Sequence, residues 1–269
     1  MAGRRRHPVV KRLERALGLG WTYPRGKIPP LQVFGRRMLE RMADRYGMYL
    51  TTSMSTPYKP ISHRVFMRDT PVRMHLDYVR YATAELLCRE VIARGLTGNI
   101  GEVGVYQGWW ARVVNHHLPD RTIYLFDTFK GFDQRDLEGQ AHAGLSTDAP
   151  YEVGEVDPSE ALAGLHHPEK AVIRAGWFPQ TAEGLEDETF CLVDVDTGLY
   201  EPTLAGLRWF YPRLVPGGFL TVVDYNNAHT NGVRPAVEQF VAESGADFVV
   251  VPDLGACALF VKPRGAKAP

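Results

Sequence analysis

Cysteine is scarce in this 269-residue chain, and long apolar runs are missing from it. The three cysteines, Cys88, Cys191 and Cys257, lie far apart and form no C-x-x-C pair. This excludes a disulfide framework or a thiolate zinc site and is typical of a reducing cytosol. No run of about 18 uncharged apolar residues predicts a membrane-spanning helix, and no signal-peptide core follows the basic first residues. We therefore expect a cytoplasmic protein that makes no membrane contact.

Net charge is lacking as well, although the charges are unevenly distributed. The chain has 31 basic and 31 acidic residues, but eight basic residues and a single acid fall within residues 1–27. A basic segment can contact nucleic acid or a membrane surface, yet no aromatic residue interrupts the arginine run at residues 4–6 to stack on bases. We therefore expect no nucleic-acid partner. The segment is interpreted as a solvated arm, or as an arm that packs on a second copy of the chain in a homo-oligomer.

The pattern of the sequence changes near residue 70. Residues 20–62 are rich in proline, glycine and aromatic residues, which favours irregular structure. We interpret residues 1–70 as a basic, irregular arm with one helical piece at 37–46, and residues 71–269 as a single domain.

From residue 99 onward, short apolar runs alternate with helical segments. The predicted strands are 100–105, 122–126, 171–174, 190–195, 219–223, 247–251 and 257–261. The predicted helices are 73–94, 109–118, 159–165, 181–185, 202–214 and 233–244, with a long polar loop at 127–157 and a helix stop at 215–218. This alternation predicts an α/β fold with a doubly wound, Rossmann-like sheet, and the short last link predicts a C-terminal antiparallel hairpin. Such an outline is that of class I S-adenosylmethionine (SAM) methyltransferases.

The exit of the first strand carries glycines and an acid. Gly104 and Gly108 allow a tight turn and a close approach of the backbone to a ligand. Glu102, inside the strand, disfavours a pyrophosphate and suits a cationic ligand, such as the sulfonium and ammonium groups of SAM. Asp127 ends the next strand 23 residues after Gly104, the spacing of an acid that binds ribose hydroxyls. The alternatives are a purely structural turn at the glycines and a helix N-cap at Asp127.

Acids also follow two later strands. Asp194 and Asp196 end the fourth predicted strand, and Asp224 follows the fifth. Carboxylates that meet in a cleft repel each other, and Mg²⁺ or a similar cation would relieve the repulsion. The alternative is a set of helix-capping acids. His142 and His229, in predicted loops, are either candidate bases or solvated surface residues.

Between about residues 73 and 262, these motifs resemble the macrocin-type (TylF-like) O-methyltransferases, which methylate sugar hydroxyls of bacterial natural products. The matching stretches are 101–108, 124–132, 176–181, 199–203, 210–214, 224–227 and 232–233. The resemblance implies a SAM cofactor, Mg²⁺ and a small-molecule acceptor. The residues it assigns to SAM are Glu102, Gly104, Tyr106, Gly108, Asp127, Thr128, Gly176, Trp177 and Phe178, the last three beside the adenine. The first 70 residues show no match.

The sequence departs from the family pattern at two positions. In an ungapped alignment Asp196 takes the metal position, Gly198 stands where the family has its general base, and Val223 replaces a metal ligand next to Asp224. A gapped alignment would instead place Asp194 and Asp196 on the two acids. We therefore predict Asp196 and Asp224 as ligands of a divalent cation and as residues that orient the acceptor.

Without the family's usual general base at Gly198, the sequence is compatible with three hypotheses about the activity of the protein. Asp194, His142 or His229 is the predicted replacement, because a positioned base adds about 10²–10⁴-fold to a proton transfer. The first hypothesis is O-methylation of a sugar or glycosylated acceptor. The second is N- or C-methylation, or another metal-independent reaction of SAM. The third is a binding protein without catalytic activity.

Overall fold

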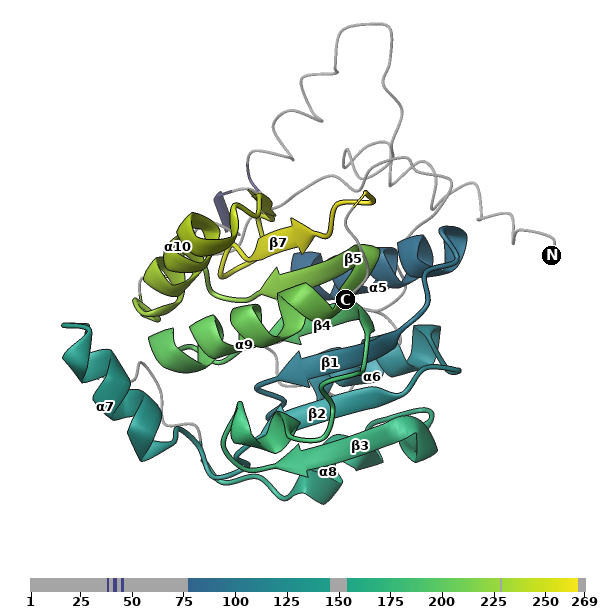
Figure 1. Cartoon of the computed structure of the whole chain (residues 1–269), viewed down its shortest axis with the longest axis horizontal. Helices are drawn as coiled ribbons and strands as arrows, with labels where there is room; N and C mark the ends of the chain where they lie inside the picture. The colour runs from purple at the N-terminus through teal and green to yellow at the C-terminus, as the bar shows by residue number, and fades with distance from the viewer. Residues whose placement is uncertain are drawn as a thin grey trace, which may run out of the picture. The chain divides into compact units, whose positions relative to one another are not determined.

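The computed structural model describes residues 77–145, 154–227 and 229–265, together with Met38, Arg41, Met42 and Arg45 (Figure 1). The chain divides into two compact units, residues 1–59 and 60–269. The four isolated residues are helical, in agreement with the helix predicted at 37–46. The remainder of the predicted arm, its basic segment included, lies outside the described residues. Among the helices of the described ranges, none combines the length and the apolarity that crossing a membrane requires.

A seven-stranded sheet forms the centre of the second unit, in the order β3-β2-β1-β4-β5-β7-β6 (Figure 1). Its strands are β1 (Asn99–Val103), β2 (Ile123–Asp127), β3 (Ala171–Ala175), β4 (Phe190–Val195), β5 (Leu214–Val222), β6 (Phe248–Val250) and β7 (Ala258–Val261). The first five strands pair in parallel, and β7 pairs antiparallel with both β5 and β6. The predicted α/β fold, doubly wound sheet and terminal hairpin are confirmed.

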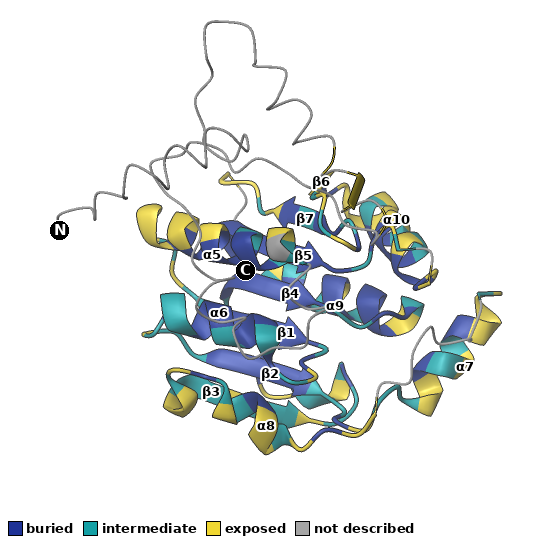
Figure 2. Ribbon diagram, turned by 180° about the vertical axis from the view of Figure 1, so that it is seen from behind, coloured by how far each residue is buried: buried dark blue, intermediate teal, exposed yellow. Residues whose placement is uncertain are grey.

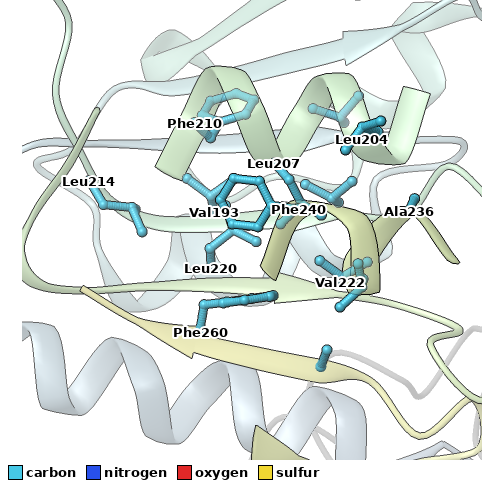
Figure 3. Close-up of a cluster of buried hydrophobic side chains, with 14 of the residues drawn as sticks. Val193, Leu204, Leu207, Phe210, Leu214, Leu220, Val222, Ala236, Phe240 and Phe260 are labelled. Atoms are coloured by element: carbon cyan, nitrogen blue, oxygen red, sulfur yellow. The ribbon is translucent and has the colours of Figure 1, made fainter. Parts of the chain in front are cut away.

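Helices cover both faces of this sheet. They are α5 (Tyr78–Ala93), α6 (Trp109–His117), α7 (Gln134–His142), α8 (Pro158–Ala163), α9 (Tyr200–Arg213) and α10 (Val233–Ser244), with short 3₁₀ turns η1 (Pro168–Lys170) and η2 (Gln180–Ala182). The core on one face is formed with α5 and α6, and the core on the other with α9 and α10 (Figures 2 and 3). The central strands are buried on both sides, as their continuous apolar runs require.

Two predicted connections contain regular structure instead. The segment predicted as a loop at 127–157 contains α7, whose start is capped by Asp133 accepting the backbone N–H of Arg135 at 3.0 Å. Its buried residues are the polar Asp136 and Gln140, so no apolar stripe marks it as a helix. The predicted stop at 215–218 lies inside β5, where the register with β4 shifts at an irregularity.

The buried face of α5 also differs from the prediction. Val79 and Leu86 are apolar residues that recur at helical spacing in the predicted helix 73–94 and were expected to face the core, but 37% and 42% of their surface is exposed. Glu85 is fully buried on this helix instead, and the side chain of Arg80 is only 15% exposed. A charged residue therefore reaches the interior from α5, and this placement bears directly on the site.

Candidate functional site

The exits of β1 and β4, by which we mean the last residues of these strands and those that follow, contact each other through their backbones. The N–H of Asp196 donates to the carbonyl of Val103 at 2.8 Å. Gly104 has a φ of +86°, and a Cβ atom at this position would lie 2.0 Å from the carbonyl oxygen of Asp196. Only glycine allows this approach, because the conformation and the contact both exclude a side chain. The glycine exit and the acids of β4 therefore share one edge of the sheet.

Asp127 shapes the loop that follows β1. Its Oδ2 accepts the backbone N–H groups of Val105 at 2.7 Å and Tyr106 at 2.8 Å, and its Oδ1 accepts that of Phe129 at 2.7 Å. These bonds hold Tyr106 in the left-handed region, at a φ of +49°, with 41% of its surface exposed. The structure thus brings Asp127 to the β1 exit as predicted, but its carboxylate is engaged with the loop. Gly108 begins α6, again with a positive φ of +70°.

The exit of β3 lies beside that of β2. The N–H of Gly176 donates to the carbonyl of Asp127 at 2.8 Å. In the turn that follows β2, the hydroxyl of Thr128 donates to the carbonyl of Gly131. Trp177 donates its indole N–H to Asp136 of α7 at 2.9 Å, and the guanidinium of Arg135 lies 4.2 Å from its ring centroid.

Phe178 was predicted beside the adenine, but the structure places it in the core. Its side chain is 5% exposed and stacks on Phe210 with a ring-centroid distance of 5.8 Å. It also packs edge to face on Phe126 at 5.4 Å. The place beside the adenine was implied by the family resemblance, whereas this side chain packs in the core.

A row of polar side chains crosses three adjacent strands. Glu102 of β1 pairs in register with Asp194 of β4, and Asp194 pairs with Thr221 of β5. Register partners point to the same face of a sheet, and here that face is the one covered by α5 and α6, where Ile100 and Leu192 also lie. The hydroxyl of Thr221 donates to Oδ1 of Asp194.

The two acids of this row are deeply buried, each with 1% of its surface exposed. Burial, together with the neighbouring Asp194 carboxylate, raises the pKa of Glu102 well above its usual range. Burial also raises the pKa of Asp194 to about 6, against the opposing effect of Arg80. The Oε2 atom of Glu102 has no hydrogen-bond partner within the part of the chain that the structure describes. A buried oxygen of this kind favours a ligand that supplies a donor.

Arg80, on α5, is the cation of this edge and was not predicted as a site residue. Its Nη2 donates to Oδ2 of Asp194 at 3.1 Å and to Oδ2 of Asp196 at 2.7 Å. The side chain of Asp196 is 29% exposed, whereas that of Asp194 is 2% exposed. Asp196 is therefore the accessible acid of the pair. No signal in the sequence marks Arg80 as a site residue, because its two partners lie 114 and 116 residues away.

Asp224 lies two residues after the end of β5, in the left-handed region at a φ of +62°. Burial, and then the nearby Asp196 carboxylate, raises the pKa of Asp224 to about 6, while a hydrogen bond from the side chain of Asn227 opposes the shift. Its carboxylate faces Gly255, where a Cβ atom would meet Oδ1. The structure thus places Asp196 near enough to Asp224 for its charge to raise the pKa of Asp224.

The other candidate bases do not join this group. His142 ends α7 and His229 follows the β5 exit, and both are exposed. The backbone N–H of His229 donates to Oδ1 of Asn227 at 3.0 Å. Gly198, which the ungapped alignment placed at the family's base, has a φ of +68°, a conformation that favours glycine.

The acids do not fit the predicted divalent-cation site. Of the two predicted ligands, Asp196 has a carboxylate oxygen bonded to Arg80, which also binds Asp194. In the residues that the structure describes, no group of three or more His, Cys, Asp or Glu side chains is arranged to hold a metal ion. The alternative of helix-capping acids at Asp196 and Asp224 is not what the structure shows either, because the N-cap residues of α9 and α10 are Leu199 and Gly232.

A cavity of about 390 Å³ lies at the opposite edge of the sheet, lined by residues that include Tyr211, Ser244 and Lys262. The ammonium of Lys262 donates to the carbonyl of Tyr211 at 3.0 Å. None of the predicted site residues lines this cavity, so we place the site at the carboxyl ends of the strands, where wound sheets bind their ligands.

Three curated relatives share part of this sequence. The chain is 26% identical over 172 residues to the demethyldecarbamoylnovobiocin O-methyltransferase of Streptomyces niveus, which covers 59% of this chain and 65% of the relative. It is 29% identical over 144 residues to the mycinamicin III 3''-O-methyltransferase of Micromonospora griseorubida, covering 49% and 56%. It is 28% identical over 178 residues to a rhamnosyl-tetracenomycin-C 4'-O-methyltransferase of Streptomyces olivaceus, covering 60% and 67%. The chain thus spans less than two thirds of the first two relatives.

Solved structures share the fold. The structure of the O-methyltransferase NovP matches with a TM-score of 0.54 at 21% identity, covering 71% of this chain and 82% of that one. The calicheamicin methyltransferase CalS11 matches with a TM-score of 0.53 at 18% identity, covering 78% and 94%. The sequence pattern of the macrocin-O-methyltransferase (TylF) family matches residues 50–252, beginning inside the segment that we predicted as an unmatched arm. The chain therefore belongs to the macrocin-O-methyltransferase (TylF) family.

Proposed function

We propose that the chain is a SAM-dependent methyltransferase that acts on a hydroxyl of a sugar or glycosylated small molecule in bacterial natural-product biosynthesis. Membership in the TylF family and three relatives named as O-methyltransferases of antibiotics support this proposal. The observation that carries it is the contact of Gly104 with the backbone of Asp196, because it joins the glycine exit of β1 to the acids of β4 at one edge.

The residues at this edge fit SAM. Oε2 of Glu102, which is buried and has no hydrogen-bond partner among the described residues, would accept a hydrogen bond from the ammonium group of the cofactor. The loop at Val105 and Tyr106, held by Asp127, would then border the nucleoside. When bound, SAM supplies a methyl group made electrophilic by its positively charged sulfur.

We assign the general base to Asp224. Asp194 was a predicted candidate, but it is buried and bonded to both Thr221 and Arg80, so an acceptor does not reach it. The half-buried Asp224 accepts the proton of the acceptor hydroxyl in this proposal, and its raised pKa of about 6 makes it a stronger base than an ordinary carboxylate. Asp196, fixed by Arg80, orients the same hydroxyl.

The localisation, the oligomeric state and the domain bounds that we propose are based on the family and on the composition of the sequence. We propose a cytoplasmic homo-oligomer in which residues 71–269 form the catalytic domain. N- or C-methylation stays the second candidate, because Arg80 engages the acids that a metal-dependent O-methyltransferase would use.

The test is methyl transfer from labelled SAM to a panel of demethylated glycosides, including precursors of novobiocin and mycinamicin type. Asp224→Asn is expected to lower the turnover number about 10²–10⁴-fold, with SAM affinity unchanged within about twofold, because the residue faces the acceptor in this proposal. Asp187→Asn, at an exposed position, is the matched control. Wild-type turnover by Asp224→Asn would refute the assignment of the base, and the absence of transfer to any hydroxyl with transfer to an amine would favour the second candidate.

A further inference from the structure

We propose that Arg80 stands in the place of the divalent cation and acts as a built-in positive charge that positions Asp196 toward the acceptor. The catalytic part of this inference rests on the proposed function, whereas the exclusion of a divalent cation by Arg80 does not.

The contacts of the guanidinium carry the inference. A single nitrogen, Nη2, bonds one carboxylate oxygen of Asp194 at 3.1 Å and one of Asp196 at 2.7 Å. The bond to Asp196 has the length of a strong, charge-assisted hydrogen bond. Carboxylate oxygens are also the ligands that Mg²⁺ and Ca²⁺ select. Arg80 therefore competes for the same atoms.

The fold holds Arg80 at this position. It lies in the first turn of α5, where its backbone N–H donates to the capping Asp77 at 3.3 Å. Its guanidinium carbon lies 5.7 Å from the ring centroid of the buried Tyr81. Asp194 is fixed from the other side by Thr221. Withdrawal of the guanidinium would leave Asp194 charged, buried and without its cation, which is strongly unfavourable.

Arg80 changes the balance of charge around Asp194 and Asp196. Asp194 and Asp196 carry two formal negative charges that one guanidinium partly compensates. A divalent cation bound to the same oxygens would lie against the guanidinium and be repelled by it. The side chain of Asp196 keeps 29% exposure, so its remaining oxygen is available to an acceptor hydroxyl. Arg80 is thus a positioning residue that acts through Asp196.

The test measures Mn²⁺ binding by electron paramagnetic resonance on the full-length wild type, Arg80→Ala, Arg80→Lys and the control Arg94→Ala, which removes an exposed arginine at the C-cap of α5 that is bonded to Glu90. Wild type, Arg80→Lys and Arg94→Ala are expected to bind no Mn²⁺ at the edge. Arg80→Ala is expected to gain a site, with a thermal midpoint raised by Mn²⁺. A wild type that binds Mn²⁺ stoichiometrically, or a folded Arg80→Ala that gains no site, would overturn the proposal.

Turnover gives the second measurement. Wild-type transfer is expected to survive EDTA, whereas Arg80→Ala is expected to lose about tenfold or more in turnover and to regain part of it with Mg²⁺. Rescue by a cation separates positioning from a structural defect. EDTA-sensitive wild-type transfer would contradict the proposal. Failure of the proposed function would show as no methyl transfer by wild type, with the Mn²⁺ result unaffected.

Discussion

Asp136 shows how one buried carboxylate depends on its surroundings. It lies on α7, is 7% exposed and accepts the indole N–H of Trp177 at 2.9 Å. Burial raises its pKa to about 6, against the effect of the indole hydrogen bond. The folded state therefore favours the protonated carboxyl, and the stability that this provides is lost as pH rises from about 4 through about 6.

Asp136→Asn is expected to remove this pH dependence, because an amide keeps the acceptor for Trp177 and does not ionise. The free energy of unfolding of the variant relative to wild type should rise between pH 4 and pH 8, by on the order of 1–3 kcal/mol. Urea unfolding at constant ionic strength measures the difference. Ala141→Ser, an exposed change on the same helix that removes no titratable group, should give a difference that does not vary with pH. An equal difference at both pH values for Asp136→Asn would show that the carboxyl is not perturbed.

At the scale of elements, the β1 exit is the most constrained turn of the site. Gly104→Ala would place a methyl group 2.0 Å from the carbonyl oxygen of Asp196 at a φ of +86°. We expect a loss of about 3 kcal/mol or more in unfolding free energy, together with a loss of SAM binding. Gly95→Ala is the matched control, because Gly95 also has a positive φ of +61° but no neighbour within 4 Å. That variant should lose about 1–2 kcal/mol and keep SAM affinity, and equal effects of the two substitutions would contradict the packing of the exits.

Apolar periodicity predicts the elements of this fold where burial is apolar. The bounds of β4 and α10 agree with the predicted 190–195 and 233–244, because both elements bury continuous or periodic hydrophobic residues. α7 escaped prediction, because it buries Asp136 and Gln140 rather than an apolar stripe. Gln140 is held by the fold itself, since its side-chain oxygen accepts the N–H of Tyr200 at 2.9 Å.

The site was predictable only in part, for the same reason. Acids at the carboxyl ends of parallel strands converge by topology, so Glu102, Asp194 and Asp196 could be placed together from sequence. Arg80 could not, because its partners lie 114 and 116 residues away and it shares its helix with the more apolar Val79. A hydropathy pattern buries Val79 and exposes Arg80, whereas pairing with two carboxylates reverses that order.

For the molecule as a whole, the sheet determines where chemistry can occur. Its five parallel strands end at one edge, beside which α7 lies, and helices close both faces (Figures 1 and 2). The edge carries buried carboxylates from β1 and β4 and one half-buried acid after β5. The three buried cysteines are free, and burial raises the pKa of Cys191 to about 11, so they serve as core residues.

Calorimetric titration of SAM into the full-length chain tests the central claim most directly, with Glu102→Gln as the variant and Glu160→Gln, exposed on α8, as the control. Wild type and the control should bind SAM at one site per chain. Glu102→Gln should bind about tenfold or more weakly, because it loses a charge-assisted hydrogen bond. A wild type that binds neither SAM nor its demethylated product, or a Glu102→Gln variant with wild-type affinity, would contradict the account.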